Sequence, residues 1–437
     1  MTEGKISKSI ILFALPILFG NLFQQLYTVV DSIVVGNVIG KEALAAVSST
    51  GSIINLIIGL INGIFVGAGV IIARYYGARN KEHLSLAVHT TMAFGLIAGI
   101  AVTIIGIMLA PWLLKVTATP DDVFADAVKY LRLYFVGGTG IVMYNACMGV
   151  FQAIGDSRRP LHYLIIASIM NIILCILFVV VFNFGIGGTA IATAISQVVS
   201  AILGFIALTN ADGDYKVEIK KIKINGEMLK ILLKMGLPTG IQNSIVAFAN
   251  VIVQSNINQF GSVVMAGNGS YTKLEGFAFL PITSFSLALT TFIGQNLGAE
   301  QYDRAKQGAR FGIIAGVSLT EIIGILIWIF APKLVAIFNS TPDVIKEGVI
   351  QANILCPFYF LLALSHCLSG ILRGAGKTNI PMIVMLVSWC LIRIAYITIM
   401  VKIIPDIRVV FWAYPLTWFI SSVIFLIYYK KTNWLAE

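Results

Sequence analysis

Apolar stretches of roughly twenty residues recur along the whole chain and are separated by short polar segments. Four of these stretches carry almost no charge: Ile97–Leu114, Leu164–Phe182, Ile313–Ile329 and Ile383–Val401. Each is close to the ~20 residues that a helix needs to cross a hydrocarbon core of ~30 Å. Their apolar residues are continuous and do not alternate with polar ones. This favours helices over barrel strands as the structure that satisfies the backbone inside a bilayer.

The pattern predicts an all-α membrane protein with twelve transmembrane helices. We expect them at about residues 10–35, 44–72, 86–112, 127–153, 160–182, 188–209, 232–258, 265–293, 306–329, 348–372, 380–401 and 410–428. Only one connection, 210–231, is long and strongly basic. The sequence therefore predicts two six-helix lobes, 1–209 and 232–437, joined by a cytoplasmic linker at 210–231 and enclosing a central cavity.

The two halves also look like copies of one another. A shift of about 221 residues brings several landmarks into register: Leu15-Pro16 with Leu237-Pro238, Gly77-Ala78 with Gly298-Ala299, and Thr119-Pro-Asp121 with Thr341-Pro-Asp343. Internal repeats of this kind are the basis of many transporter folds. Because each copy holds an even number of helices, both copies have the same topology across the membrane.

Composition agrees with a membrane protein and gives its orientation. Hydrophobic residues make up 58% of the chain, charged residues 11%, and the mean hydropathy is +0.91, whereas soluble domains are about 25% charged. The net charge of +10 does not indicate a nucleic-acid partner, because the basic residues lie between the apolar spans. With the amino terminus inside, twenty Lys and Arg fall on the inner side and eight on the outer. This predicts a multi-pass protein of the cell membrane with both termini cytoplasmic.

Polar residues inside the first predicted helix form one stripe. Asn21, Gln24, Gln25, Thr28 and Asp31 recur at helical spacing. A carboxylate within a span is costly, so Asp31 is a candidate for binding a cation or a proton. The alternative is a buried, hydrogen-bonded structural carboxyl. The position that matches Asp31 in the second half is Val253, and this asymmetry favours the ion-handling interpretation.

Two neutral residues of the first half could complete a site around Asp31. Asn171 in the fifth helix and Thr193 in the sixth would add amide and hydroxyl oxygens, which together with one carboxylate suit a hard cation such as sodium. A proton would need only the carboxylate. The alternative for Asn171 and Thr193 is that they hold helices together, as polar residues in membranes commonly do.

Further polar residues of both halves are candidates for a substrate cavity: Gln24, Thr28, Asn250, Gln254, Lys273, Glu275 and Arg393. Lys273 and Glu275 are two residues apart on one helix and point in different directions. We therefore expect one of them to pair with Arg393 or His366. A purely structural ion-pair network is the alternative.

The chain carries no sign of a nucleotide site or of a catalytic cluster. The glycine-rich segment Gly63–Gly69 lacks the Lys-Ser/Thr of a phosphate-binding loop, and we interpret its glycines as sites of close helix packing. The five cysteines lie in predicted spans without metal-ligand spacing. The four histidines are scattered. We expect a protein that is not an enzyme, has no organic cofactor and is driven by an ion gradient.

Several motifs resemble those of the multidrug and toxic compound extrusion (MATE) family. They are Ala14-Leu-Pro16, Tyr27-Thr-Val-Val-Asp31 with Gly36, Gly185-Ile-Gly-Gly-Thr-Ala-Ile-Ala-Thr-Ala-Ile-Ser-Gln197, and Gly294-Gln-Asn-Leu-Gly-Ala299. The resemblance runs from about Ile10 to Leu426. It implies a prokaryotic cation-coupled antiporter that expels amphipathic, often cationic compounds by alternating between outward- and inward-facing states.

The resemblance also implies an ion site. Asp31 matches the family's acidic residue on helix 1, and Asn171 and Thr193 match its Asn on helix 5 and Thr on helix 6. The family's second Asp, four residues after that Asn, is replaced here by Cys175. Loss of one carboxylate favours a proton or a weaker sodium site. Sodium at Asp31 is the one metal that we expect, and we expect a monomer.

The main alternative function is a flippase for a lipid-linked or anionic metabolite, a related class with a similar number of helices. Such substrates require a basic cavity, and Lys273 with Arg393 would provide part of one. Transport stimulated by anionic substrates would favour this alternative.

Overall fold

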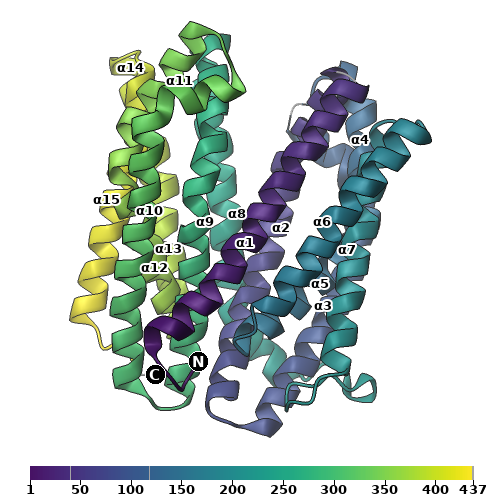
Figure 1. The fold of residues 1–437 in the computed structure, drawn as a ribbon, viewed down its shortest axis with the longest axis vertical. Helices are drawn as coiled ribbons and strands as arrows, with labels where there is room; N and C mark the ends of the chain where they lie inside the picture. Colours follow the sequence, from purple (N-terminus) through teal and green to yellow (C-terminus); the bar gives the residue numbers. More distant parts are fainter. Residues whose placement is uncertain (40, 118, 436–437) are drawn as a thin grey trace. The chain divides into compact units, whose positions relative to one another are not determined.

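The structure, a computed structural model, describes residues 1–39, 41–117 and 119–435, without the side chains of 27–34, 36–37, 41–42, 44–45 and 48. Almost all of the described residues are helical, and this part of the chain contains no strand (Figure 1). The predicted all-α fold class is confirmed.

The first half of the chain contains seven α-helices and two short π-helical segments. They are α1 (Ile6–Val34), η1 (Val35–Ile39), α2 (Lys41–Gly77), α3 (Lys81–Val116), α4 (Asp121–Val136), α5 (Gly138–Ala153), α6 (Arg158–Ile176), η2 (Leu177–Val181) and α7 (Ile186–Thr209).

A short 3₁₀ turn, η3 (Ile219–Lys221), lies in the linker, and the second half follows. It consists of α8 (Gly226–Asn258), α9 (Ser262–Gly298), α10 (Tyr302–Phe338), α11 (Pro342–Leu355), η4 (Cys356–Phe358), α12 (Tyr359–Gly374), α13 (Asn379–Met385), η5 (Leu386–Ile392), α14 (Arg393–Ile403) and α15 (Ile407–Lys431).

The number of spans agrees with the sequence prediction. In the described part of the chain, 11 helical segments are long and apolar enough to cross a membrane, or 12 when α4 and α5 count as one bent span. Several helices extend beyond the predicted limits. For example, α10 covers Tyr302–Phe338 where 306–329 was expected, because a helix continues past the apolar residues by which hydropathy detects it.

The bend of 48° between α4 and α5 has a local cause in a pair of glycines. A Cβ on Gly137 would lie 2.7 Å from the Cα of Ala194, and a Cβ on Gly138 would lie 2.8 Å from the hydroxyl of Thr103. The backbone N–H of Thr139 donates to that same hydroxyl at 2.9 Å. The break therefore lets the span pack closely on both α3 and α7.

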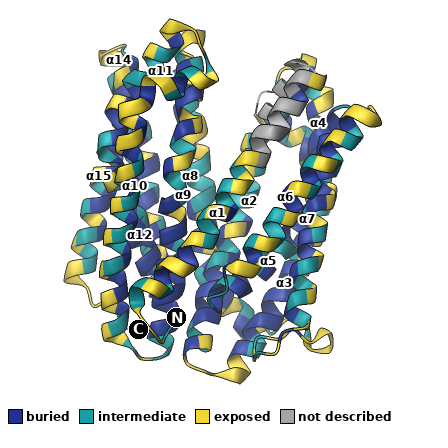
Figure 2. Ribbon diagram, in the orientation of Figure 1, coloured by how far each residue is buried: buried dark blue, intermediate teal, exposed yellow. Residues whose placement is uncertain are grey.

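By its contacts the chain divides into two compact units, which we describe separately. Unit 1 comprises Met1–Leu18 and Ile241–Glu437, and unit 2 comprises Phe19–Gly240. In unit 1, α9 packs against α10, α11 and α12; in unit 2, α5 packs against α2, α3 and α7. Buried side chains line the inner faces of the helices within each unit (Figure 2). The division at 1–209, 210–231 and 232–437, drawn from the sequence repeat, remains a prediction.

Glycines of α2 and α8 form the closest helix contact in unit 2. A Cβ on Gly63 or on Gly67 would lie 2.4 Å from the Cα of Gly240 or Gly236, respectively. Both helices therefore use the small-xxx-small spacing that lets membrane helices approach closely. The interpretation of Gly63–Gly69 as a packing segment is confirmed.

The basic linker is anchored to unit 2 by backbone hydrogen bonds. The N–H of Val217 donates to the carbonyl of Leu208 at 3.0 Å, and the N–H of Glu218 donates to Nε2 of His89 on α3 at 2.9 Å. Glu218 also accepts a hydrogen bond of 2.8 Å from Lys221, which holds the pKa of its carboxyl below the ordinary value. The linker therefore lies against the end of α3.

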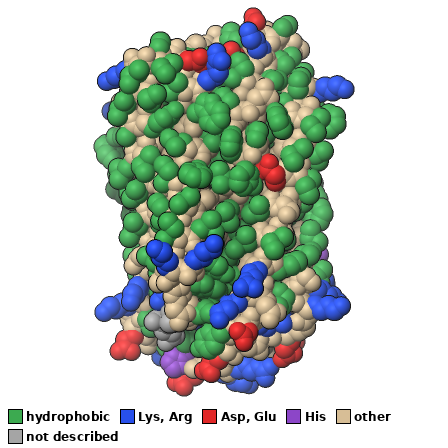
Figure 3. All heavy atoms as spheres, turned by 90° about the vertical axis from the view of Figure 1, so that its left-hand side faces the viewer, with side chains coloured by type: hydrophobic (Ala, Val, Ile, Leu, Met, Phe, Trp, Pro, Cys, Tyr) green, Lys and Arg blue, Asp and Glu red, His purple; other side chains and the backbone are tan. Residues whose placement is uncertain are grey.

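The surface is that of a membrane protein. On the face shown in Figure 3, hydrophobic side chains cover a broad middle zone, and Lys and Arg gather toward the two ends. Large apolar residues such as Met108 and Ile314 are 71% and 66% exposed. Exposure of this extent is expected where the surrounding solvent is lipid.

Candidate functional site

Asn171 on α6 and Thr193 on α7 form a buried pair in unit 2. The amide Nδ2 of Asn171 donates to the hydroxyl oxygen of Thr193 at 3.1 Å, and that hydroxyl donates to the carbonyl of Thr189 at 3.1 Å. The two residues are 2% and 9% exposed. The structure therefore brings together the two neutral residues that the sequence assigned to one ion site.

The third member of that predicted site is Asp31 on α1, and its side chain lies outside the described residues. The side chain of Thr28, a residue predicted for the substrate cavity, lies outside them as well. Cys175, one helical turn after Asn171, is 1% exposed and packs with Val179 and with Ala192, the neighbour of Thr193. A carboxylate at position 175 would thus face α7 close to the level of the Asn171–Thr193 pair.

A polar cavity of about 180 Å³ lies inside unit 2. It contains the predicted residue Gln24, together with amides that sequence analysis did not select. The polar residues that line it are Asn21, Gln24, Asn62, Tyr134, Tyr144, Asn145, Gln152 and Gln197. Gln197 lies one turn after Thr193 on α7, so this helix connects the cavity to the Asn171–Thr193 pair.

A second polar cavity, of about 160 Å³, lies inside unit 1. We call it the unit 1 cavity. Its lining combines charged, amide and aromatic side chains from α8, α9, α11, η5, α14 and α15. The residues are Asn250, Gln254, Asn268, Thr272, Glu275, Phe279, Gln351, Trp389, Arg393, Tyr414 and Trp418. Four of the predicted substrate residues, Asn250, Gln254, Glu275 and Arg393, therefore meet in one place.

Arg393 is the most constrained residue of the unit 1 cavity. Its side chain is 1% exposed, and its Nε and Nη2 donate to the hydroxyl of Thr417 at 3.2 and 2.7 Å. The guanidinium carbon lies 4.4 Å from the ring centroid of Tyr414 and 5.1 Å from that of Trp389. Aromatic faces and one hydroxyl thus stabilise a buried positive charge.

The lining of the unit 1 cavity also contains a carboxyl group and an amide oxygen that accepts no hydrogen bond within the described chain. Glu275 on α9 interacts electrostatically with Arg393, yet among the described ion pairs of 4.0 Å or less none joins these two residues. The Oε1 of Gln351, a residue that is 2% exposed, accepts no hydrogen bond within the described chain. The cavity therefore presents one cation, one carboxyl group and an unused acceptor to a ligand.

Lys273 does not belong to the unit 1 cavity. Its side chain is exposed, and its Nζ lies 5.2 Å from the ring centroid of Phe338. The reason is helical geometry: Glu275, two residues away, points inward, so Lys273 points elsewhere. His366, the other partner considered for these charges, makes edge contacts with Phe279 and Trp389. His366 therefore packs against two of the aromatic residues that line the unit 1 cavity.

The sequence alone did not reveal the aromatic residues of the unit 1 cavity or two of its amides, Asn268 and Gln351. Trp389 and Tyr414 resemble interface aromatics in the sequence, and Gln351 lies at the polar end of its span. The spacing of Trp389 and Arg393, four residues apart, could have revealed that they share one helical face. Gln254 is held by two amide hydrogen bonds: it accepts one from Asn268 at 3.0 Å and donates one to Asn258 at 2.8 Å. The bond to Asn268 on α9 could be predicted only by knowing which helices are neighbours.

Comparison with known proteins supports both the repeat and the fold. The family model described as MatE matches the chain twice, at residues 16–177 and 238–399. The two matches begin 222 residues apart, which confirms the repeat expected from the landmarks of the sequence.

Among curated proteins, the probable multidrug resistance proteins YoeA and YpnP of Bacillus subtilis are similar to this chain. YoeA is 28% identical, over 88% of this chain and 84% of its own length. YpnP is 26% identical, over 100% of this chain and 97% of its own length. The multidrug export protein MepA of Staphylococcus aureus is 21% identical, over 86% and 83%.

Solved structures give the same fold. A crystal structure of MATE in complex with MaL6 matches with a TM-score of 0.92 and 24% identity, covering 99% of this chain and 97% of that one. The outward-facing conformation of a multidrug resistance MATE family transporter matches with a TM-score of 0.92, 23% identity and the same coverage. With 11 or 12 apolar spans in the described part of the chain, a tandem repeat and two matches to the MatE model, the chain belongs to the MATE family of multidrug efflux transporters.

Proposed function

We propose that this transporter exports small amphipathic organic compounds, chiefly cationic ones, in exchange for a cation, by alternating access. It resides in the cell membrane as a monomer with both termini in the cytoplasm. Sodium or a proton is the coupling ion, and no organic cofactor takes part. The coupling ion binds at Asp31, Asn171 and Thr193. The observation that supports this proposal is the buried hydrogen bond of 3.1 Å between Asn171 and Thr193, because it joins two neutral, oxygen-bearing side chains within unit 2.

The coupling follows from the charge of one side chain. Binding of a cation or proton at Asp31 removes the cost of a charged carboxylate within a membrane span and so changes which packing of α1 is the more stable. A substrate that binds preferentially to the other state then competes with the ion through one two-state equilibrium. Loading on the outer side, where the gradient favours it, drives release of the exported compound.

Efflux from vesicles tests the proposal directly. Purified transporter is reconstituted in proteoliposomes, and efflux of a cationic dye is followed while sodium and proton gradients are imposed separately. We expect one of the two gradients to drive efflux and the other to have little effect. Equal efflux in the absence of both gradients would contradict ion coupling.

The buried guanidinium of Arg393 favours a second candidate, transport of an anionic or lipid-linked metabolite. Its test is to replace Arg393 with Gln and to compare efflux of an anionic and a cationic fluorophore, with melting temperature as the measure of folding. A selective loss of anion efflux of about tenfold or more would support this candidate, since hydrogen bonds to charged groups contribute about 1.5–3 kcal/mol. An equal effect on both fluorophores would exclude it.

A further inference from the structure

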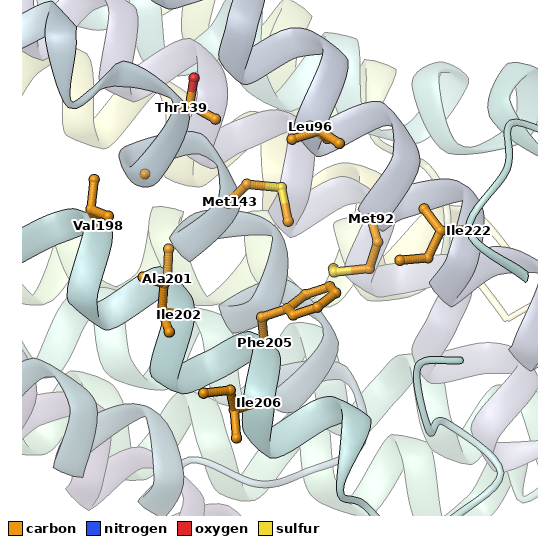
Figure 4. A pocket seen from close by; sticks show the side chains of 11 residues that line it. Met92, Leu96, Thr139, Met143, Val198, Ala201, Ile202, Phe205, Ile206 and Ile222 are labelled. Carbon is orange, nitrogen blue, oxygen red and sulfur yellow. The ribbon is translucent and has the colours of Figure 1, made fainter. Parts of the chain in front are cut away.

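An apolar groove of about 410 Å³ opens on the surface of unit 2, separate from both polar cavities. We call it the α3–α7 groove. Its lining consists of Met92, Leu96, Thr139, Gly140, Met143, Val198, Ala201, Ile202, Phe205, Ile206 and Ile222. In Figure 4 the side chains of Met92, Met143 and Phe205 converge on its interior, and Ile222 lies beside Met92.

Helix packing explains why the groove exists. The helix α5 packs against both α3 and α7 and forms the floor. At Gly140 the approach is so close that a Cβ would lie 2.7 Å from Val198. The rims are exposed: Leu96 on α3 and Ile202 on α7 are 45% and 51% accessible. The groove therefore opens on the membrane-facing surface.

The length of the groove along α7 is close to the thickness of one leaflet. Val198 and Ile206 mark its extent along α7, and eight residues at 1.5 Å each give about 12 Å. Half of a hydrocarbon core of ~30 Å is about 15 Å. The groove ends near the last turn of α7, which finishes at Thr209, so it extends from mid-membrane to the side on which the linker lies.

The linker closes this end and carries positive charge there. The hydrogen bonds of Val217 and Glu218 hold the linker in place, and Ile222 reaches the groove. Lys220 and Lys223 flank Ile222 and are exposed, and neither is in an ion pair among those described. Lys221, in contrast, is paired with Glu218 at 2.8 Å.

These features select a lipid over a drug as the occupant. Pockets for small organic molecules contain a few polar groups that fix orientation. Thr139 is the one residue of the lining with a polar side chain, and its hydroxyl lies 3.0 Å from that of Thr103. An acyl chain needs no such groups. A phosphate beside two lysines gains roughly 1 kcal/mol for each of them.

We propose that the α3–α7 groove binds one acyl chain of an anionic phospholipid from the leaflet on the linker side, with its phosphate beside Lys220 and Lys223. The bound lipid ties the linker to α3, α5 and α7. The proposal does not depend on the coupling ion or on the exported substrate.

Native mass spectrometry of the whole transporter, with phosphatidylglycerol or phosphatidylcholine as the probe, tests this proposal. We expect wild type to retain phosphatidylglycerol preferentially, and the double variant Lys220→Gln/Lys223→Gln to lose at least about fivefold of that preference. The matched control is Lys430→Gln/Lys431→Gln at the end of α15, which should keep the preference. Equal preference in wild type and both variants would overturn the proposal.

A second pair of variants tests the groove itself. Ile202→Trp fills the groove, whereas Ile314→Trp places the same side chain on an exposed position of α10 outside it. We expect retention of phosphatidylglycerol to fall for Ile202→Trp alone. Unchanged retention, or displacement of the lipid by an exported dye at equal concentration, would overturn the proposal and identify the groove as a drug site.

Discussion

At the scale of single residues, the proposed ion site depends on a small number of oxygen atoms. The hydroxyl of Thr193 accepts from Asn171 and is itself held by the carbonyl of Thr189. The rotamers of both side chains are thereby fixed before an ion arrives. This preorganisation reduces the cost of assembling ligands around a cation, and it makes the pair sensitive to small substitutions.

Replacing Thr193 with Val removes the acceptor of Asn171 and conserves shape. A buried hydrogen bond contributes about 1 kcal/mol, so we expect its loss to raise the cation concentration for half-maximal efflux about fivefold with little change in maximal rate. The matched control is Ser200→Ala on the same helix, whose hydroxyl bonds only to the carbonyl of Ser196. Equal cation dependence in both variants would show that Thr193 is structural only.

Cys175 offers the opposite experiment, a gain of charge. Because Cys175 packs against Ala192 beside Thr193, Cys175→Asp adds a second carboxylate near the predicted site. We expect sodium dependence of efflux to become stronger, with Cys175→Asn as the neutral control of similar size. A sodium dependence that is the same in both variants would mean that position 175 lies off the ion site.

At the scale of helices, the two copies of the repeat differ where their chemistry matters. A shift of 221 residues aligns Asn171 with Ile392 and Thr193 with Tyr414 in the sequence. Tyr414 stacks on Arg393, the residue after Ile392. The first copy therefore carries neutral polar residues, which we propose as cation ligands, whereas the second copy carries a buried guanidinium one residue after the equivalent of Asn171. A second coupling cation is thus disfavoured in the unit 1 cavity.

Helix packing makes a prediction of its own at the contact of α2 and α8. Gly67→Ala places a methyl group 2.4 Å from the Cα of Gly236, so the helices must separate. Overpacking of this kind costs about 1–3 kcal/mol, and we expect a lower melting temperature in detergent. Gly51→Ala on the same helix is the control, because nothing lies within 4 Å of its added Cβ. Equal melting temperatures for the two variants would contradict the packing.

At the scale of the whole molecule, the hydrophobic pattern predicted twelve spans, the recurring landmarks predicted the repeat, and the resemblance of several motifs predicted the family. These features can be recognised from short stretches of sequence, because each span is continuously apolar and the landmarks recur in register. The bend at Gly137 and Gly138 was not predicted, because glycines are common in membrane helices. Only the close neighbours Ala194 and Thr103 make a glycine necessary at these two positions. Helix ends beyond the bilayer were likewise missed, since hydropathy does not report them.

The residues of the candidate sites also fall into those that the sequence could reveal and those that it could not. Asn171, Gln24 and Glu275 could be found because a polar residue in an apolar span is conspicuous. Gln351 and Trp389 could not, because their importance depends on which helices face one another around the unit 1 cavity. Lys273 was predicted for a substrate cavity together with Glu275 and does not join Glu275 in the unit 1 cavity. Sequence gives the helix, but not which side of it faces the protein interior.

We propose that Asp31 couples export to an ion gradient, and the variant Asp31→Asn provides a direct test. Wild type and Asp31→Asn are reconstituted at equal density, and dye efflux driven by the effective gradient is compared with dye binding and melting temperature. We expect Asp31→Asn to keep its melting temperature and its dye binding and to lose gradient-driven efflux. Normal gradient-driven efflux by Asp31→Asn would contradict it.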